Sequence, residues 1–120
     1  ENKFGRIVNI SSLWSTLASS QRTSYSISKA ALDALTRNLA VEFGNCGVLV
    51  NSILPGFVDT KLTRKNLSAK RISEIIIDTP IQSLVDTIDI AKLTYFLGSI
   101  NNQSITGQSI AIDGGYSIYR

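Results

Sequence analysis

The sequence predicts an α/β fold in which parallel strands alternate with helices. Three observations carry this prediction: short β-branched apolar runs recur along the chain, a stretch with helical periodicity separates the first two, and glycine or proline follows most of these segments. The 120 residues supply only three such strands, whereas doubly wound sheets usually have about five or six. We therefore interpret residues 1–120 as the C-terminal part of one doubly wound parallel-sheet domain.

The first strand is predicted at Gly5–Ile10, where a β-branched apolar run enters a loop rich in Ser and Thr. A helix is predicted next, at Thr23–Phe43, because apolar residues from Ile27 to Val41 recur on one face at the helical period. Further apolar residues widen this face, so we expect the helix to be covered on more than one side. Gly44 is predicted to end the helix.

The second strand is predicted at Val48–Ile53, a β-branched run that leads into the turn Pro55-Gly56. A strand, a helix and a strand in this order predict a right-handed parallel crossover. Such a crossover brings the residues that follow each strand to one edge of the sheet, which is where open α/β sheets bind ligands.

The second half of the chain is predicted to contain helices and one more strand. One or two short helices are expected within the segment Lys61–Ile77, which combines charged residues with an apolar run. A longer helix is predicted at Thr87–Leu97, with Gly98 after its end, and the third strand at Gly107–Ile112. No internal repeat or low-complexity linker divides these elements into two domains.

The composition restricts the chemistry that this chain can perform. Cys46 is the only cysteine, so an intrachain disulfide is excluded and a cysteine-based metal site would lack ligands. The chain has no histidine, which excludes His-dependent triads and the commonest zinc sites, and no metal site is expected. Proton transfer near neutral pH therefore falls to a Tyr, Lys, Asp, Glu or Cys side chain.

Neither a membrane nor a nucleic acid is expected as a partner. No apolar run approaches the roughly eighteen residues of a membrane span, and no N-terminal segment has the pattern of a secretion signal. The net charge is +3, and the densest basic group, between Lys61 and Arg71, is typical of a solvated helix face. We expect a soluble, cytoplasmic protein.

A set of side chains suited to proton transfer is predicted near the end of the first strand. Tyr25 and Lys29 are four residues apart on the predicted helix, so they share one face and can meet the same small molecule. Ser11 and Ser12 follow the first strand directly, at the ligand-binding edge. A phenol has a pKa of about 10, but a neighbouring ammonium favours phenolate, and a serine hydroxyl can hold a substrate oxygen while the proton moves.

Five blocks cover nearly the whole chain: GRIVNISS at 5–12, YSISKAA at 25–31, LAVEFG at 39–44, VNSILPGFVDT at 50–60 and ITGQSIAIDGG at 105–115. In these residues and in their order, the chain resembles the short-chain dehydrogenase/reductase family, whose members have a Rossmann-like fold. The resemblance implies an oxidoreductase that transfers a hydride between a nicotinamide cofactor, NAD or NADP, and a small-molecule carbonyl or alcohol substrate. It also implies that Asp113-Gly114-Gly115, which could pass for a ligand loop, is the turn after the last strand.

The resemblance assigns three catalytic residues. Ser12 stands thirteen positions before Tyr25, which is the family spacing of the active-site serine, and Ser11 is then a packing neighbour. Tyr25 would be the general acid/base and would lie against the cofactor. Lys29 would both lower the pKa of Tyr25 and hydrogen-bond the nicotinamide ribose.

The residues after the second strand resemble the family loop that lies against the nicotinamide. Pro55 and Gly56 begin this loop, the backbone of Val58 would meet the carboxamide, and Thr60 would add a side-chain contact. Trp14 follows Ser12 in the loop that borders the substrate in the family. Contact with substrate and simple surface packing are both open for this tryptophan.

A complete family member begins with a strand, a Gly-rich turn and a helix that hold the cofactor pyrophosphate, followed by a residue that selects NAD or NADP. This N-terminal cofactor-binding half is absent from the sequence, as is the family's active-site asparagine on the helix before Gly5. We expect residues 1–120 alone to be inactive and the full-length protein to be an oxidoreductase. The alternative is a truncated, non-catalytic structural or oligomerisation module of the same descent.

The resemblance also bears on assembly and substrate. The family commonly dimerises through the helix predicted at Thr23–Phe43, and the wide apolar face of this helix is compatible with a homodimer or a homotetramer. The region from Lys61 to Pro80, the substrate lid in the family, is polar and basic around an apolar centre. This composition favours a polar or anionic hydroxy or keto compound, such as a sugar derivative or a carrier-bound acyl group, over a steroid.

Overall fold

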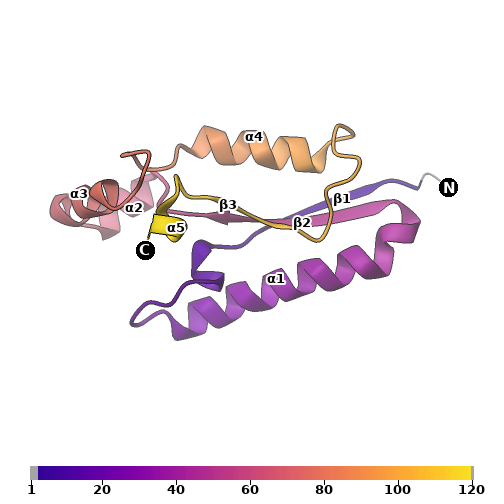
Figure 1. The fold of residues 1–120 in the computed structure, drawn as a ribbon, viewed down its shortest axis with the longest axis horizontal. Coiled ribbons are helices and arrows are strands. Elements are labelled where there is room, and N and C mark those ends of the chain that lie inside the picture. Colours follow the sequence, from indigo (N-terminus) through magenta and orange to yellow (C-terminus); the bar gives the residue numbers. More distant parts are fainter. Residues whose placement is uncertain (1–2, 120) are drawn as a thin grey trace.

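Three parallel strands form the sheet that the sequence predicts (Figure 1). The computed structural model describes residues 3–119 and contains the strands β1 (Gly5–Ile10), β2 (Val48–Pro55) and β3 (Ser109–Ile112). They lie in the order β1-β2-β3, and both pairs are parallel. Ile10 of β1 lies opposite Ile53 of β2, which in turn lies opposite Ile110 of β3. The predicted α/β class is confirmed.

Helices cover both faces of this sheet (Figure 1). The helices are α1 (Thr23–Phe43), α2 (Lys61–Asn66), α3 (Ala69–Ile77), α4 (Thr87–Gly98) and α5 (Tyr116–Tyr119), with 3₁₀ turns at Leu13–Ser15 and Gly44–Cys46. Side-chain bonds from β1 mark the two faces: Asn9 donates to Thr36 of α1, whereas Arg6 donates to the carbonyl oxygen of Asn102, which follows α4. The sheet is therefore the middle of three layers.

The two strand connections step in the same direction across the sheet but pass over opposite faces. The first runs from β1 through α1 to β2, and the second runs from β2 through α4 to β3. Parallel connections of this kind have opposite hands, so they cannot both follow the right-handed preference. Helix α4, in the segment that joins β2 to β3, therefore lies on the face of the sheet opposite to the one that α1 covers.

The side of α1 that faces the sheet is small and polar. Its buried residues are Asp33, Thr36 and Ala40, and Ser52 of β2 donates a hydrogen bond of 2.8 Å to Asp33. Within residues 3–119 nothing covers the outer apolar side of this helix, where Val41 is 86% exposed, so its expected second cover stays a prediction for the assembled protein. On its sheet side the helix docks through the hydrogen bonds from Ser52 to Asp33 and from Asn9 to Thr36, beside the small buried residue Ala40.

Side-chain caps start the shorter helices. The hydroxyl oxygen of Thr60 accepts the backbone N–H of Thr63 at 3.1 Å to begin α2, and Ser68 accepts that of Arg71 at 3.2 Å to begin α3. The region predicted to hold one or two short helices therefore holds two. Asp86 caps α4 in the same way, through a bond of 3.0 Å from the N–H of Ile88.

Three predicted boundaries are shifted by one or two residues. β2 continues to Pro55 rather than stopping at Ile53, β3 begins at Ser109 rather than at Gly107, and α4 includes Gly98. The 3₁₀ turn that starts at Leu13 and the helix α5 lie in segments for which no regular element was predicted. Helix and strand ends shift readily by this much because their terminal bonds depend on neighbouring loops.

α1 ends at Phe43 with Gly44 as its C-cap, as predicted, and a 3₁₀ turn carries the chain on to Gly47. Gly44 has a helical φ of −58°, and the chain continues through a 3₁₀ turn to Cys46. Gly47 has a φ of +77°, and its N–H donates to the carbonyl oxygen of Gly44. A Cβ at Gly47 would run into the carbonyl oxygen of Lys3, so both the backbone angle and the space require glycine here.

Two buried asparagines hold the segment between α4 and β3 against the sheet. Asn51 of β2 donates to the carbonyl oxygen of Ile105 at 2.7 Å and accepts the N–H of Gln108 at 3.1 Å. Asn102 accepts the N–H of Ile105 at 2.9 Å, and the guanidinium of Arg6 donates twice to the Asn102 carbonyl oxygen. These bonds satisfy the backbone of an irregular segment and set where β3 starts.

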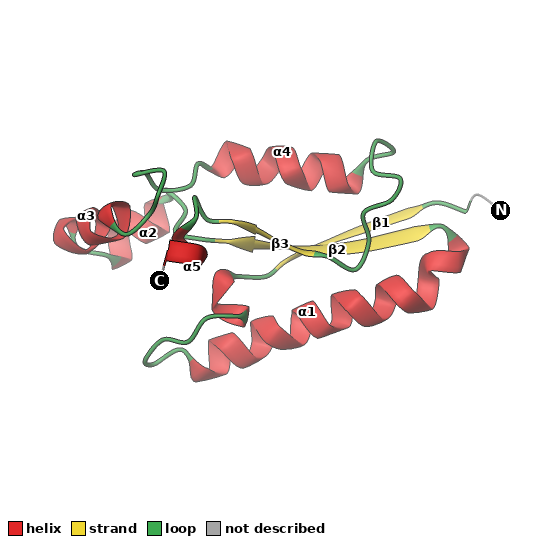
Figure 2. Cartoon of the chain, viewed as in Figure 1, coloured by secondary structure: helices red, strands yellow, loops and turns green. Residues whose placement is uncertain are grey.

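The carboxyl ends of the strands face a cluster of short elements (Figure 2). The first turn of α1 lies at this end of the sheet together with α2, α3 and α5. Leu13, Ile75 and Tyr116 form a buried core there. The ring of Phe57 packs edge-on against Tyr116 at 5.1 Å and against Trp14 at 6.1 Å. This aromatic packing supports the loops that leave β1 and β2.

Replacing Asn51 by Ala is expected to lower the free energy of unfolding by about 1–3 kcal/mol, because the buried N–H of Gln108 loses its partner and the Ile105 carbonyl loses one of two. Urea unfolding measures this change as a lower midpoint at unchanged slope. Asn101→Ala, at an exposed asparagine in the same segment, is the matched control and should change stability by less than about 0.5 kcal/mol. Equal effects of the two substitutions would contradict the role of Asn51.

Candidate functional site

Ser12, Tyr25 and Lys29 line one cavity of about 390 Å³ at the carboxyl edge of the sheet. Its walls come from four segments that are distant in sequence: the loop after β1, the start of α1, the loop after β2, and α2 with the residue that follows it. The structure therefore brings together the three residues predicted to be catalytic. The chemical role of each stays a prediction.

Tyr25 and Lys29 lie one turn apart at the start of α1. The Lys29 ammonium nitrogen is 5.7 Å from the centroid of the Tyr25 ring and donates a hydrogen bond of 2.8 Å to the carbonyl oxygen of Ile10. This bond holds the ammonium at the end of β1 and leaves two N–H groups for a ligand. Tyr25 is 40% exposed, so a molecule in the cavity can reach its phenol.

The two adjacent serines use their hydroxyl groups differently, although both are buried. Ser11 donates its hydroxyl proton to the backbone carbonyl oxygen of Lys29 at 3.2 Å. Ser12 instead accepts the backbone N–H of Trp14 at 3.2 Å, which caps the 3₁₀ turn. The hydroxyl proton of Ser12 therefore stays available to a ligand oxygen.

The loop after β2 forms the cavity wall through Pro55, Gly56 and Val58. The N–H of Gly56 donates to the carbonyl oxygen of Ile112 at 2.8 Å. A Cβ built on Gly56 would lie 2.7 Å from the Cα and Cβ of Asp113, so a side chain here would force the loop away from the turn after β3. Close backbone packing thus requires glycine here, and this packing fixes the position of the loop against the turn after β3.

Thr60 is the one predicted cofactor residue that does not line the cavity. Its hydroxyl oxygen accepts the N–H of Thr63 and lies 3.0 Å from the Thr63 hydroxyl. Thr63, one turn later, lines the cavity in its place. The residue before α2 has to cap that helix, and the cap draws the Thr60 side chain toward α2.

The same loop is tied to its surroundings on two sides. Val58 pairs with Val85 in an isolated parallel bridge, and the N–H of Asp59 donates to the carbonyl oxygen of Val85 at 2.9 Å. Arg64 of α2 makes two hydrogen bonds of 2.6 Å to the Asp59 carboxylate. The Arg64 guanidinium holds the pKa of Asp59 below its usual value. The loop and α2 are therefore coupled as one wall of the cavity.

Arg22 also lines the cavity, and the sequence did not predict it. Its charged guanidinium makes it the most important of the residues that were missed. Its guanidinium carbon is 5.8 Å from the centroid of the Tyr25 ring. The spacing of Arg22, Tyr25 and Lys29 is one that places residues on a single helix face, so periodicity could have found it. The α2 residues Leu62 and Asn66 also line the cavity and were missed because helix orientation is not readable from a short polar segment.

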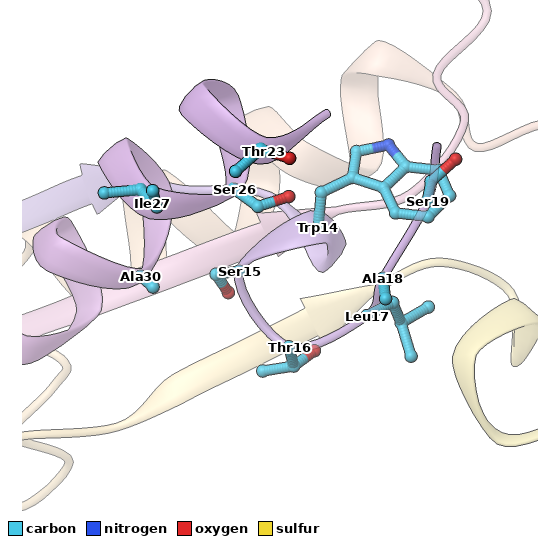
Figure 3. Close-up of a pocket in the computed structure, with 10 residues that line it drawn as sticks. All are labelled: Trp14, Ser15, Thr16, Leu17, Ala18, Ser19, Thr23, Ser26, Ile27 and Ala30. Carbon is cyan, nitrogen blue, oxygen red and sulfur yellow. The ribbon is translucent and has the colours of Figure 1, made fainter. Parts of the chain in front are cut away.

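A second cavity of about 380 Å³ lies between the loop after β1 and the first turns of α1 (Figure 3). Thr23, Ser26 and Ile27 of α1 line it, and none of the predicted catalytic residues does. Trp14 lines both cavities and therefore separates them. The hydroxyl of Ser15 is buried in this region with no hydrogen-bond partner.

Asp113 belongs to the turn after β3, as the sequence implied. Its carboxylate oxygens accept the N–H groups of Gly115 at 2.9 Å and Ser117 at 2.8 Å. Burial raises the pKa of Asp113, but the hydrogen bonds from Ser117 and Gly115 outweigh burial and hold this pKa below its usual value. The ionised carboxylate therefore stabilises the turn on which Gly56 rests.

The part of the chain that the structure describes offers neither a cluster of metal ligands nor a membrane-spanning helix. Within residues 3–119, no three His, Cys, Asp or Glu side chains gather in a way that could hold a metal ion. No helix in that range has both the length and the apolar character needed to cross a membrane.

Known proteins resemble nearly the whole chain. A family model described as enoyl-(acyl carrier protein) reductase matches residues 1–117. The 3-oxoacyl-[acyl-carrier-protein] reductase of Pseudomonas aeruginosa is 35% identical over 113 residues, which are 94% of this chain and 45% of that protein. The human (3R)-3-hydroxyacyl-CoA dehydrogenase is 38% identical over 111 residues, 92% of this chain and 42% of that protein. The chain thus spans about half the length of the curated relatives it matches.

Solved structures match the fold equally well. A putative gluconate dehydrogenase from Agrobacterium tumefaciens superposes with a TM-score of 0.90 at 28% identity, over 96% of this chain and 46% of that chain. The structure of ElxO with NADP bound has a TM-score of 0.87 at 36% identity, over 95% and 47%. A 7α-hydroxysteroid dehydrogenase complexed with NADH and 7-oxo glycochenodeoxycholic acid has a TM-score of 0.87 at 32% identity, over 91% and 43%.

Replacing Asp113 by Asn is expected to destabilise the protein at pH 7 and to matter less as the pH falls below about 4. Because the folded-state pKa is lowered, the carboxylate stabilises the fold fully above the unfolded-state pKa of about 3.9. That contribution is lost as the pH falls through the lower folded-state value. Thermal unfolding at pH 7 and pH 3 measures the gap in Tm between parent and variant, which should narrow at pH 3.

Asp89→Asn, at an exposed position on α4, is the control for removing one negative charge. The difference in Tm between the parent and Asp89→Asn at pH 7 should be much smaller than that for Asp113→Asn. A gap for Asp113→Asn that is the same at both pH values would show that the substitution acts through packing and not through the charge.

Proposed function

We propose a function from one premise: this chain belongs to the short-chain dehydrogenase/reductase family. The protein that contains it is an NAD(P)-dependent oxidoreductase that transfers a hydride between a nicotinamide and the carbon of a small carbonyl or alcohol substrate. The observation that carries the proposal is the gathering of Ser12, Tyr25 and Lys29 in one cavity. The printed activities of the relatives, which are reductases and dehydrogenases, support it.

The donor set of the cavity fits the nicotinamide end of such a cofactor, NAD or NADP. Pro55, Gly56 and Val58 offer a wall with a closely packed backbone, and Lys29 has two N–H groups free for ribose hydroxyls. We assign the carboxamide to the Val58 backbone. The Thr60 hydroxyl caps α2, so it would have to leave the Thr63 N–H to add the further contact that the family resemblance implies. When bound, the nicotinamide supplies or accepts the hydride.

The residues of this chain would handle the proton. In reduction, Tyr25 donates its phenolic proton to the substrate oxygen, and in oxidation it takes the proton back from the substrate hydroxyl. The Ser12 hydroxyl holds the same oxygen by donating a hydrogen bond to it. The Lys29 ammonium places its positive charge beside the phenol, where negative charge develops during the transfer.

The relatives favour a polar substrate without selecting one. Their printed names include a 3-oxoacyl-[acyl-carrier-protein] reductase, a (3R)-3-hydroxyacyl-CoA dehydrogenase and a galactitol 2-dehydrogenase. These names support the polar hydroxy or keto compound that the lid composition suggests, either a sugar derivative or a carrier-bound acyl group. A steroid stays the less favoured substrate, although one solved neighbour is a hydroxysteroid dehydrogenase.

We further propose that residues 1–120 are the C-terminal portion of one Rossmann-like domain, and that residues outside them hold the cofactor pyrophosphate. The match to about half of each relative supports this division. The uncovered apolar side of α1, where Ile27 is 64% and Leu35 is 48% exposed, supports assembly into a homodimer or a homotetramer. Light scattering of the complete protein would test the assembly, and a stable monomer would contradict it.

Tyr25→Phe in the complete protein is expected to lower kcat by about 10²-fold or more, because the substitution removes the proton donor and leaves the aromatic ring in place. Titration of NAD(P)H by fluorescence should give a dissociation constant close to that of the parent. Lys29→Ala should weaken cofactor binding as well as turnover. Near-parental kcat in Tyr25→Phe would rule out the mechanism and favour the non-catalytic module.

The adjacent serines offer a matched pair for the same assay. Ser12→Ala should lower kcat, since Ser12 has a hydroxyl proton available to the substrate oxygen. Ser11→Ala should affect stability more than turnover, since its proton is bonded to the Lys29 carbonyl oxygen. The opposite order of effects on kcat would move the catalytic assignment from Ser12 to Ser11.

A further inference from the structure

Arg22 shares the cavity with the residues assigned to proton transfer. It precedes α1 directly and lies one turn before Tyr25 and two turns before Lys29. Its guanidinium carbon is 5.8 Å from the centroid of the Tyr25 ring. One small substrate could therefore place an acidic group at Arg22 and its reacting oxygen at the Tyr25 phenol, with only a few bonds between the two groups.

The hydrogen-bonding capacity of the Arg22 guanidinium is unused in the part of the chain that the structure describes. Other arginines are engaged: Arg6 donates to backbone carbonyl oxygens, and Arg64 and Arg71 pair with carboxylates. No hydrogen bond or ion pair to the Arg22 guanidinium is found among residues 3–119. A guanidinium presents five N–H donors in a planar fork that matches a carboxylate or a phosphate.

The charges around the cavity all favour an anion. Arg22 and Lys29 line the cavity, and no Asp or Glu among residues 3–119 does. Helix α2 also carries Lys61 and Lys65, which do not line the cavity and have no ion pair within the described residues, while Arg64 is paired with Asp59. The summed charge of these five cations and of Asp59 is more positive than the net charge of the whole chain, which is +3. The resulting positive field attracts acidic ligands to the cavity.

Of the two lining cations, Arg22 is the one free to bind a substrate. The Lys29 ammonium is held by the Ile10 carbonyl oxygen and faces Tyr25, where the proposed mechanism uses it. Gln21, just before Arg22, has a left-handed backbone with a φ of 62°, an arrangement uncommon for residues other than glycine. This turn directs the chain into α1 with the Arg22 side chain on the cavity side.

We propose that Arg22 determines substrate specificity by binding an acidic group, a carboxylate or a phosphate, close to the reacting carbon. The preferred substrate is then an oxo or hydroxy compound that carries such a group, and its neutral analogue is a poor substrate. This inference rests on the proposed oxidoreductase function and narrows its substrate class. Arg22 takes no part in proton or hydride transfer, so its loss should affect substrate binding and leave the chemical step intact.

The test measures reduction of matched acids and esters by the complete enzyme with NADH and NADPH. The probes are pyruvate, acetoacetate and levulinate, in which the ketone lies at increasing distance from the carboxylate, and the ethyl ester of each. The parent enzyme should prefer at least one acid over its ester by about 10-fold or more in kcat/KM. Arg22→Gln should lower kcat/KM for that acid by about 10–100-fold, mainly through KM, and should change the ester by less than about 2-fold.

Two further variants separate the fork from the charge. Arg22→Lys keeps the charge but not the planar fork, and it should recover only part of the preference for the acid. Arg37→Gln removes one positive charge from an exposed position on α1 outside the cavity and should leave the acid-to-ester ratio at the parent value. Added salt should raise the KM of the acid and leave that of the ester unchanged.

The outcomes that overturn the inference differ from those that overturn the proposed function. Equal losses for acid and ester in Arg22→Gln would make Arg22 a residue that positions Tyr25, and a parent enzyme that prefers the esters would exclude an anion site. Both outcomes would leave an active oxidoreductase. No reduction of any probe or of a wider panel of ketones, with either cofactor, would refute the proposed function, and the inference would fall with it.

Discussion

Ser11 extends the ladder between β1 and β2 by donating its backbone N–H to the carbonyl oxygen of Ile53, 2.8 Å away. The register that this bond continues decides which side chains reach the cavity, because a slip of one residue turns every side chain of a strand to the opposite face. In the observed register, the segments after β1 and β2 leave the sheet at one edge, beside the first turn of α1. Strand pairing thus places Ser12 and Gly56, each close to the end of its strand, in the lining of one cavity.

Buried hydrogen bonds, more than a large apolar core, give this chain its specific arrangement. Asn51 and Ser52 are adjacent on β2 and point to opposite faces, where one fixes the segment before β3 and the other fixes α1. Burying such groups costs free energy unless each finds its partner, so few alternative packings satisfy them. The approach of Gly56 to Asp113 acts in the same direction, because the two loops lie so close that a side chain at position 56 would not fit between them.

Sequence patterns predicted the order and type of the main elements because periodicity and turn residues are local signals. They failed where the outcome depends on tertiary contacts. Gly44 ends α1 as predicted, but the 3₁₀ turn that continues to Gly47 was not predicted, and it brings Gly47 against the Lys3 carbonyl oxygen. The spacing of Tyr25 and Lys29 was readable, whereas the pull of a helix cap on Thr60 required the position of α2. Which face of α1 meets the sheet was likewise hidden, since Asp33 and its partner on β2 are distant in sequence.

The polar inner side of α1 has a consequence for the direction in which its first turn points. An apolar helix face can roll on a sheet by some degrees with little change in contact, but the bonds from Asn9 to Thr36 and from Ser52 to Asp33 break on such a rotation. These two bonds fix the rotation of α1 about its own axis. Tyr25 belongs to the same continuous helix, so its orientation is fixed as well. The direction in which the Tyr25 phenol points is therefore fixed by hydrogen bonds that lie two to three helical turns away from it.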